Sequence, residues 1–164
     1  MSDHFFKYLF VASILILQSA CSSDDDDDTF GLGDPCGVVE EIAPAAIVSG
    51  GLTVNDCTAE QTFPDLSSGD TSFVDEYRVT LDIPGTLTIT MRSTDLDAFL
   101  LLIPGGSTCE NGCDSSIVIT TNNNSGGGSD ALISQDLAAG SYGIHANSIQ
   151  PGTGRYTLET TFTP

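Results

Sequence analysis

The chain has very little positive charge. Its 164 residues include 4 Lys and Arg against 23 Asp and Glu, so the formal net charge is −19. The single lysine, Lys7, lies near the start, and the other cations are Arg78, Arg92 and Arg155. A strongly negative surface repels the phosphates of nucleic acids, which excludes nucleic acid as a partner. It also repels anionic lipid headgroups, so any attachment to a membrane must come from something other than charge.

Histidine and the usual catalytic motifs are scarce as well. The body of the chain has one histidine, His145, and neither His-Glu-x-x-His nor Gly-x-Ser-x-Gly occurs. His145 alternates with the apolar Ile144 and Ala146, which predicts that it faces solvent from a strand. A zinc site is also disfavoured, because it needs four converging ligands and the body of the chain has one histidine. We therefore predict a protein that is not an enzyme. The alternative is an exported hydrolase working through carboxylates, which needs one raised carboxyl pKa and a substrate cleft.

A long apolar segment is the third feature that the chain lacks. Its longest run, Tyr8 to Leu17, has 10 residues, whereas a bilayer-spanning helix needs about 20. The run follows Lys7 and precedes the small residues Ser19 and Ala20. A short positive region, a short apolar core and small residues are typical of a secretory signal peptide, here predicted over residues 1–20.

Cys21 follows these small residues directly. The segment resembles the lipobox of bacterial lipoproteins, in which cleavage occurs before a cysteine that carries lipid. Gln18 stands where that pattern usually has an apolar residue, and Leu17 lies one position further back. The resemblance implies lipidation of Cys21 and an exported, membrane-anchored lipoprotein, and Ser22 after the cysteine implies the outer membrane or cell surface. The alternative is ordinary cleavage near Ala20, which would leave Cys21 free or remove it.

An acidic segment follows the cysteine. Residues 21–35 contain five consecutive aspartates, Asp24 to Asp28, with Ser, Thr and Gly and little apolar content. Like charges repel one another and keep such a segment extended. We therefore predict a tether over residues 21–35 and a folded domain over residues 36–164.

The number of cysteines supports the lipoprotein interpretation. The chain has five, an odd number for an exported protein. If Cys21 carries lipid, the other four can pair in an oxidising compartment. Four cysteines allow three pairings, and the spacing favours Cys36 with Cys57 and Cys109 with Cys113.

Alternation of apolar and polar residues predicts an all-β domain. Period-two patterns mark strands with one buried face, and turn dipeptides separate the segments. Phe99–Ile103 is apolar throughout, which predicts a strand that is covered on both faces or lies at the centre of the sandwich. Ile47–Val54 predicts a pair of strands around Gly50-Gly51, and Val38–Ala46 is a weak candidate for a helix. The remaining predicted strands lie at 78–83, 87–91, 117–121, 131–137, 142–146 and 156–162. Seven to nine short strands with regular turns indicate an antiparallel β-sandwich.

Five short motifs occur in order along these strands. They are Asp75-Glu76-Tyr77-Arg78-Val79, Gly85-Thr86-Leu87-Thr88-Ile89, Asp95-Leu96-Asp97-Ala98-Phe99-Leu100, Leu137-Ala138-Ala139-Gly140-Ser141-Tyr142 and Gly154-Arg155-Tyr156-Thr157-Leu158. Together they resemble the bacterial pre-peptidase C-terminal domain over residues 46–162. The resemblance implies a jelly-roll-like β-sandwich without catalytic activity. It also implies a binding or accessory role, because related modules bind collagen or other polymers, some with calcium.

Carboxylates at strand ends and loops are candidate calcium ligands. Calcium takes six to eight oxygen ligands, which two or three carboxylates and some carbonyls can supply. The candidates are Asp95, Asp97, Asp75, Glu76 and Asp130. The alternative is that Asp95 and Asp97 are turn residues that face solvent.

Three tyrosines, Tyr77, Tyr142 and Tyr156, could form a binding stripe on one sheet, because tyrosine is enriched at recognition surfaces. Each is in register with an apolar residue two positions on, which predicts the core instead. We therefore predict a non-catalytic cell-surface binding or accessory module with a surface polymer or envelope protein as its partner.

Overall fold

The structure is a computed structural model that describes residues 39–105 and 115–164. The predicted signal peptide, Cys21 and the acidic tether lie outside these residues, as do Cys36, Cys109 and Cys113. Within the described ranges, the chain has no helix with the length and apolar character needed to cross a membrane.

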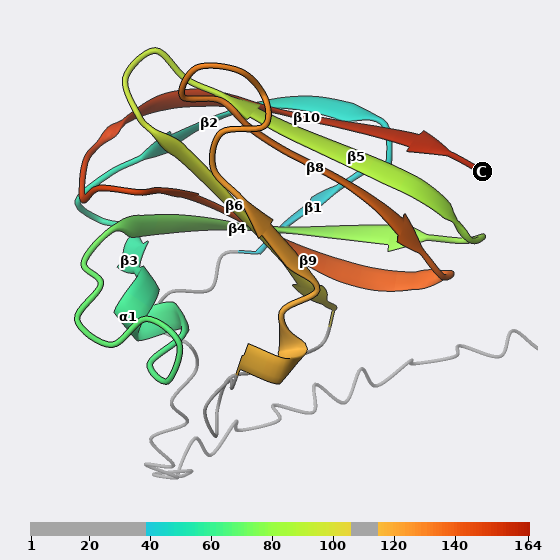
Figure 1. Cartoon of the computed structure of the whole chain (residues 1–164), viewed down its shortest axis with the longest axis horizontal. Coiled ribbons are helices and arrows are strands. Elements are labelled where there is room, and N and C mark those ends of the chain that lie inside the picture. The colour runs from blue at the N-terminus through green and yellow to red at the C-terminus, as the bar shows by residue number, and fades with distance from the viewer. Residues whose placement is uncertain (1–38, 106–114) are drawn as a thin grey trace, which may run out of the picture. The chain divides into compact units, whose positions relative to one another are not determined.

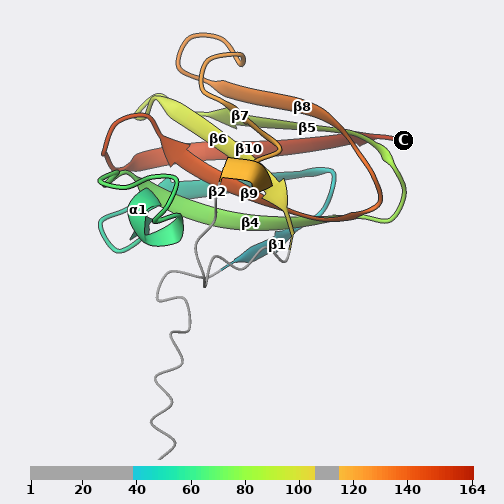
Figure 2. The same ribbon diagram turned by 60° about the horizontal axis from the view of Figure 1, so that its bottom comes forward.

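Two sheets make up the described part of the chain (Figures 1 and 2). Sheet A has the order β1-β4-β9-β6-β7, with β3 paired to β4, and sheet B has the order β2-β10-β5-β8. All pairs are antiparallel except β1 with β4. The strands are β1 Glu40–Ile42, β2 Ala46–Leu52, β3 Cys57–Thr58, β4 Phe73–Leu81, β5 Gly85–Arg92, β6 Ala98–Pro104, β7 Thr120–Asn122, β8 Ala131–Leu137, β9 Gly140–Ser148 and β10 Gly154–Thr163. The antiparallel β-sandwich predicted from alternation is confirmed.

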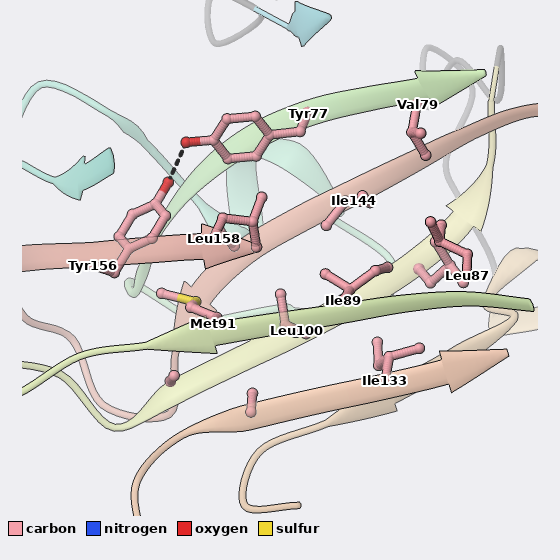
Figure 3. Packing of buried hydrophobic residues seen from close by; sticks show 14 of the residues in the cluster. Tyr77, Val79, Leu87, Ile89, Met91, Leu100, Ile133, Ile144, Tyr156 and Leu158 are labelled. Carbon is pink, nitrogen blue, oxygen red and sulfur yellow. Dashed lines mark hydrogen bonds between the residues drawn. The ribbon is translucent and has the colours of Figure 1, made fainter. Parts of the chain in front are cut away.

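The main core lies between the two sheets. Alternate residues of each strand point inward, and those that are completely buried include Val79, Leu87, Ile89, Leu100 and Leu158. Figure 3 shows these side chains meeting from both sheets. Fully burying one such side chain contributes about 1.5–3 kcal/mol to folding. The two sheets are therefore held together chiefly by aliphatic packing.

The outer face of sheet A is covered by short segments of the chain. The helix α1, Ala59–Thr62, begins with a capping box between Thr58 and Gln61 and packs against β4 (Figure 1). Behind β6, the 3₁₀ helix η1, Ser115–Ile117, precedes β7. The outer apolar cluster consists of Phe63, Leu101 and Ile103, with the partly buried Leu66, Phe99, Ile117 and Val118 packed against them. The prediction that Phe99–Ile103 is covered on both faces is confirmed.

On each edge strand of sheet B, one backbone N–H group is hydrogen-bonded to a side chain of sheet A. The backbone N–H of Gly51 on β2 donates a hydrogen bond to Asp75 of β4. The N–H of Leu132 on β8 donates to Oδ1 of Asn122 on β7, at 3.1 Å. Edge strands expose unpaired backbone groups that invite pairing with other chains, and each of these bonds satisfies one such group.

Two local predictions are wrong. Ile47–Val54 does not form a pair of strands, because β2 continues through Gly50-Gly51 and pairs with β10 along its length. Gly50 lies opposite Tyr156, and a Cβ there would be 2.3 Å from the Cζ atom of Tyr156. Gly50 therefore accommodates the tyrosine ring and makes no turn. The described part of the predicted helix Val38–Ala46 gives β1 and the start of β2, and the α-helix within the described ranges lies instead at α1.

Candidate functional site

The outer face of sheet B is open and carries hydroxyl groups. The residues that alternate with the core on β5 are three threonines and Arg92; Thr86 and Thr88 are half-buried, and Thr90 is buried. Near the end of the sheet, Ser49, Thr157 and Arg92 are paired in register across β2, β10 and β5. Paired residues of neighbouring strands point to the same side of a sheet. The register therefore brings together three polar side chains that are far apart in the sequence.

A groove lies over this row of residues. Its volume is about 650 Å³, and a second hollow of about 510 Å³ adjoins it. Both hollows are lined by Ser49, Gly50 and Arg155, so Arg155 lies between them. We call this site the Arg155 groove. Its main hollow is lined by Ser49, Gly50, Arg92, Ser93, Thr94, Asp95, Asp130, Arg155, Tyr156 and Thr157.

Arg155 differs from the other two arginines of the sandwich. Arg78 forms an ion pair with Glu41 at 2.9 Å, and Arg92 forms one with Glu159 at 2.6 Å. Among the described residues, the guanidinium of Arg155 has neither an ion pair nor a hydrogen bond. An exposed guanidinium with five free donors can bind a planar anion such as a carboxylate in bidentate fashion.

Two of the predicted calcium ligands line the same groove. Oδ2 of Asp95 accepts a hydrogen bond from the backbone N–H of Arg155 at 3.3 Å. Oδ1 of Asp130 accepts one from the N–H of Ser93, also at 3.3 Å. The hydroxyl of Ser93 donates to the backbone carbonyl of Arg155 at 2.7 Å. Asp95 is therefore held to the backbone of Arg155, and Asp130 to the backbone of Ser93, whose hydroxyl contacts Arg155.

Two glycines shape the groove near Arg155. Gly51 is paired with Arg155, and a Cβ at Gly51 would make ordinary contacts, 3.5 Å from the carbonyl oxygen of Gly154 and 3.9 Å from the Cγ atom of Arg155. A Cβ at Gly154 would be 2.7 Å from the Cβ of Asp95. Gly154 therefore allows the turn that carries Asp95 to approach the start of β10.

Beneath the groove, a chain of hydrogen bonds joins the two sheets. The hydroxyl of Tyr156 donates to Oδ2 of Asp75 at 2.5 Å, and the hydroxyl of Tyr77 lies 2.6 Å from that of Tyr156. Figure 3 shows the two rings meeting between β4 and β10. Because the hydroxyl hydrogen of Tyr156 is engaged in the bond to Asp75, Tyr77 is the donor of the second bond. Tyr77 and Tyr156 are buried, and Tyr142 is packed against the same core, which confirms the predicted core positions.

Burial is the main cause of the pKa shifts in the hydrogen-bonded group of Asp75, Tyr156 and Tyr77. Desolvation raises the pKa of Asp75, the hydrogen bond from Tyr156 lowers it, and repulsion by Asp56 raises it further. Burial also raises the pKa of Tyr156, with a further contribution from the charge of Asp75. Both tyrosines therefore remain protonated donors at neutral pH. The chain of bonds satisfies polar groups that would otherwise be buried without partners.

His145 does not face solvent as predicted. It does lie on the outer face of sheet A, but the segment after β3 covers that face and buries the imidazole. The ring of Phe63 contacts it edge-on, with 4.6 Å between ring centroids. Its Nδ1 has no hydrogen-bond partner within the described residues, and Oε1 of Glu76 lies 3.9 Å away. Burial lowers the pKa of His145 to about 3, so the imidazole is neutral at physiological pH.

The five calcium candidates are distributed over several parts of the fold. Asp95 and Asp130 line the Arg155 groove, Asp75 is bonded to Tyr156, and Glu76 lies beside His145. Asp97 is exposed in the turn before β6. In the part of the chain that the structure describes, no group of three or more His, Cys, Asp or Glu side chains is arranged to hold a metal ion. Calcium binding stays a prediction.

The predicted lipid and disulfide sites fall almost entirely outside the described residues. Cys57 begins β3 and is disulfide-bonded. The other four cysteines, Cys21, Cys36, Cys109 and Cys113, lie in the ranges that the structure does not describe. The pairings Cys36 with Cys57 and Cys109 with Cys113, and the lipidation of Cys21, therefore stay predictions.

No family model and no curated protein sequence matches the chain. Solved structures do match its fold. The pre-peptidase C-terminal domain of a collagenase from Bacillus anthracis is similar, with a TM-score of 0.54 and 13% identity over 75% of this chain and 94% of that chain. PliG from Aeromonas hydrophila, a periplasmic inhibitor of g-type lysozyme, gives a TM-score of 0.50 and 13% identity over 76% of this chain and 97% of that chain.

These similarities concern the fold. The resemblance to the pre-peptidase C-terminal domain, predicted from five motifs, is confirmed at that level. The structure also explains two of the motifs physically, since Asp75 and Tyr77 on β4 meet Tyr156 on β10 through hydrogen bonds. Ligands cannot be transferred from a shared fold, because the binding residues are placed on it independently.

Proposed function

We propose that this chain is an exported, lipid-anchored, non-catalytic binding module whose ligand site is the Arg155 groove. The observation that carries the proposal is the unpaired guanidinium of Arg155, which lies between two adjoining hollows in a chain that is otherwise strongly acidic. An arginine surrounded by so many carboxylates would readily form an ion pair. Its position in an open groove instead suits recognition of an external ligand.

The comparisons support an exported role. The similar pre-peptidase C-terminal domain is by name part of a collagenase, and PliG is described as periplasmic and as an inhibitor. Neither description names a catalytic activity for the shared fold itself. By analogy of fold alone, this chain would also act outside the cytoplasm by binding a partner. The signal peptide and lipobox predicted around Cys21 point in the same direction.

The hydrolase alternative is less well supported by the position of the carboxylates. The carboxyl group with a raised pKa, Asp75, is hydrogen-bonded to Tyr156 and is not among the residues that line the groove. A general acid must reach the substrate atom that it protonates. Asp75 instead joins the two sheets beneath β2.

The binding role is tested with the purified chain and immobilised cell-wall and surface polymers of the source bacterium. We expect Arg155→Gln to lose retention on the polymer that the wild type binds. Arg78→Gln is the matched control, because it removes an exposed arginine from sheet A with the same change in charge. Equal retention of the two variants would show that the Arg155 groove is not the ligand site.

The anchor is tested separately. Cys21→Ser should move the protein from the detergent phase to the aqueous phase in a detergent partitioning experiment, because a lipid chain contributes about 0.8 kcal/mol per buried CH₂ group. Unchanged partitioning of Cys21→Ser would rule out lipidation at this residue.

A further inference from the structure

The charges around the Arg155 groove restrict the kind of ligand that fits it. The chain carries a formal net charge of −19, and the summed field of such a protein repels polyanions and lowers their association rate. At close range, the free guanidinium of Arg155 favours an anionic group. A ligand that satisfies both conditions carries a carboxylate without being negative overall.

The other wall of the groove indicates where the balancing charge lies. Asp95 and Asp130 are both fixed by hydrogen bonds from the backbone at positions 93 and 155. Ser93 joins the two sides, because its N–H donates to Asp130 and its hydroxyl donates to the carbonyl of Arg155. Both carboxylates line the same hollow as Arg155, and both can accept hydrogen bonds from an ammonium group.

The size and lining of the groove suit a small polar chain. Its main hollow of about 650 Å³ falls in the range of about 300–1,000 Å³ that is typical of sites for small ligands. Ser49 and Thr157 provide hydroxyls that line this hollow. Hydroxyls can donate to peptide carbonyls and accept from peptide N–H groups.

We propose that the Arg155 groove binds a short peptide that carries both charges, with its terminal carboxylate on the guanidinium of Arg155 and an ammonium group facing Asp95 and Asp130. This inference rests on the proposed function and names the ligand class of the same site. An acidic polysaccharide is the competing ligand, because it would offer the carboxylate without the balancing cation.

The test compares ligands that separate specific recognition from general attraction. The probes are the tripeptide Lys-Ala-Ala with a free terminal carboxylate, the same peptide as its terminal amide, and a hexamer of galacturonic acid, each titrated calorimetrically at low salt. The amide is the more positive peptide, so attraction to an acidic protein alone would favour it. The proposal predicts the reverse: the free acid binds at least tenfold more tightly, because a charge-assisted hydrogen bond to arginine is lost on amidation.

Variants then assign the contacts. Arg155→Gln should lower the affinity for the free acid to that for the amide, whereas Arg78→Gln should leave the preference unchanged. Asp95→Asn with Asp130→Asn should weaken both peptides at least tenfold. Thermal unfolding of each variant identifies any that fails to fold. If Arg155→Gln does not fold, binding is compared for Arg155→Lys, which keeps the charge but loses the bidentate geometry.

Three results would overturn the inference: tighter binding of the amide, tighter binding of the galacturonate hexamer, or no binding of the free acid. Its failure can be distinguished from that of the proposed function. If a surface polymer binds the wild type and not Arg155→Gln while Lys-Ala-Ala neither binds nor competes, the groove remains the ligand site and the peptide assignment is wrong.

Discussion

The outer faces of the two sheets differ in what lies over them. Sheet A is covered by the segment that contains α1 and by the residues around η1, and it buries an apolar cluster together with His145. Sheet B carries threonines, serines and the Arg155 groove on its outer face. One face therefore contributes to stability, and the other is available for binding. Substitutions on the two faces should accordingly affect different measurements.

The largest effect is expected on the covered face. Phe63→Ala should lower the free energy of unfolding by about 3–5 kcal/mol, because a buried aromatic ring is removed and a cavity is left beside Leu101 and Ile103. Chemical denaturation measures this loss. The control is Thr161→Ala on the exposed face of sheet B, where a change within about 0.5 kcal/mol is expected. A similar loss for both variants would contradict the distinction between the faces.

A smaller effect is expected where β2 passes over Tyr156. Gly50→Ala should lower stability by about 1–3 kcal/mol, because the added methyl group overlaps the ring of Tyr156 and displaces its bond to Asp75. Gly51→Ala is the matched neighbour, with no contact closer than 3.5 Å for the new Cβ. In thermal unfolding, the melting midpoint of Gly50→Ala should lie well below that of Gly51→Ala. Equal midpoints would mean that the ring does not occupy this position.

Much of this architecture could be predicted from the sequence, because it depends on local alternation. The strands at Gly85–Arg92 and Ala131–Leu137 and the buried tyrosines follow from period-two patterns, and the covered strand at Phe99–Ile103 follows from a continuous apolar run. The covering segment could not be predicted that way. The signal for α1 was the capping box of Thr58 and Gln61, a four-residue pattern without helical periodicity. His145 was placed in solvent because alternation gives the face of a sheet and not what lies over it.

The candidate site was missed for a different reason. Arg92 and Arg155 are 63 positions apart in the sequence, and only the register of β5 with β10 brings their neighbourhoods together. The loop positions of Asp95 and Asp130 indicate calcium ligands, and the structure places both residues in the Arg155 groove. The signal available in the sequence is the scarcity of arginine. With three arginines among many carboxylates, an arginine without a carboxylate partner is a candidate binding residue.

The covered face should also respond to pH. The pKa of His145 is about 3 in the folded protein and about 6.5 when unfolded. The unfolded chain therefore binds a proton first, so stability is fully present above pH 6.5 and is lost progressively as the pH falls toward 3. At pH 5 the loss from this residue is about 2 kcal/mol.

His145→Gln tests this dependence. The variant cannot titrate at this position, so its free energy of unfolding should fall less than that of the wild type between pH 7 and pH 5. Other groups, including Asp75 with its raised pKa, titrate in both proteins and cancel in the comparison. If the variant does not fold, the imidazole resonances of the native protein provide the same information. Proton uptake by folded His145 near pH 6.5 would be inconsistent with its burial.

The smallest effect concerns calcium. At ten times the dissociation constant, a bound ion would stabilise the native state by about 1.4 kcal/mol, which corresponds to a few degrees in melting temperature. Melting is compared at matched ionic strength in calcium, magnesium and chelator, for the wild type and Asp97→Asn. The prediction is a shift that is specific to calcium and reduced in the variant. Equal melting in the three buffers would show that Asp97 is only an exposed turn residue.

The most direct test of the difference between the faces measures ligand affinity and stability on the same two variants. Thr157→Tyr fills the floor of the Arg155 groove, and Phe63→Leu reduces packing on sheet A. Thr157→Tyr should abolish binding to the polymer retained by the wild type and leave the unfolding free energy nearly unchanged. Phe63→Leu should lower the unfolding free energy and leave the affinity of the folded protein unchanged. A loss of affinity in Phe63→Leu equal to that in Thr157→Tyr would contradict the assignment of binding to sheet B.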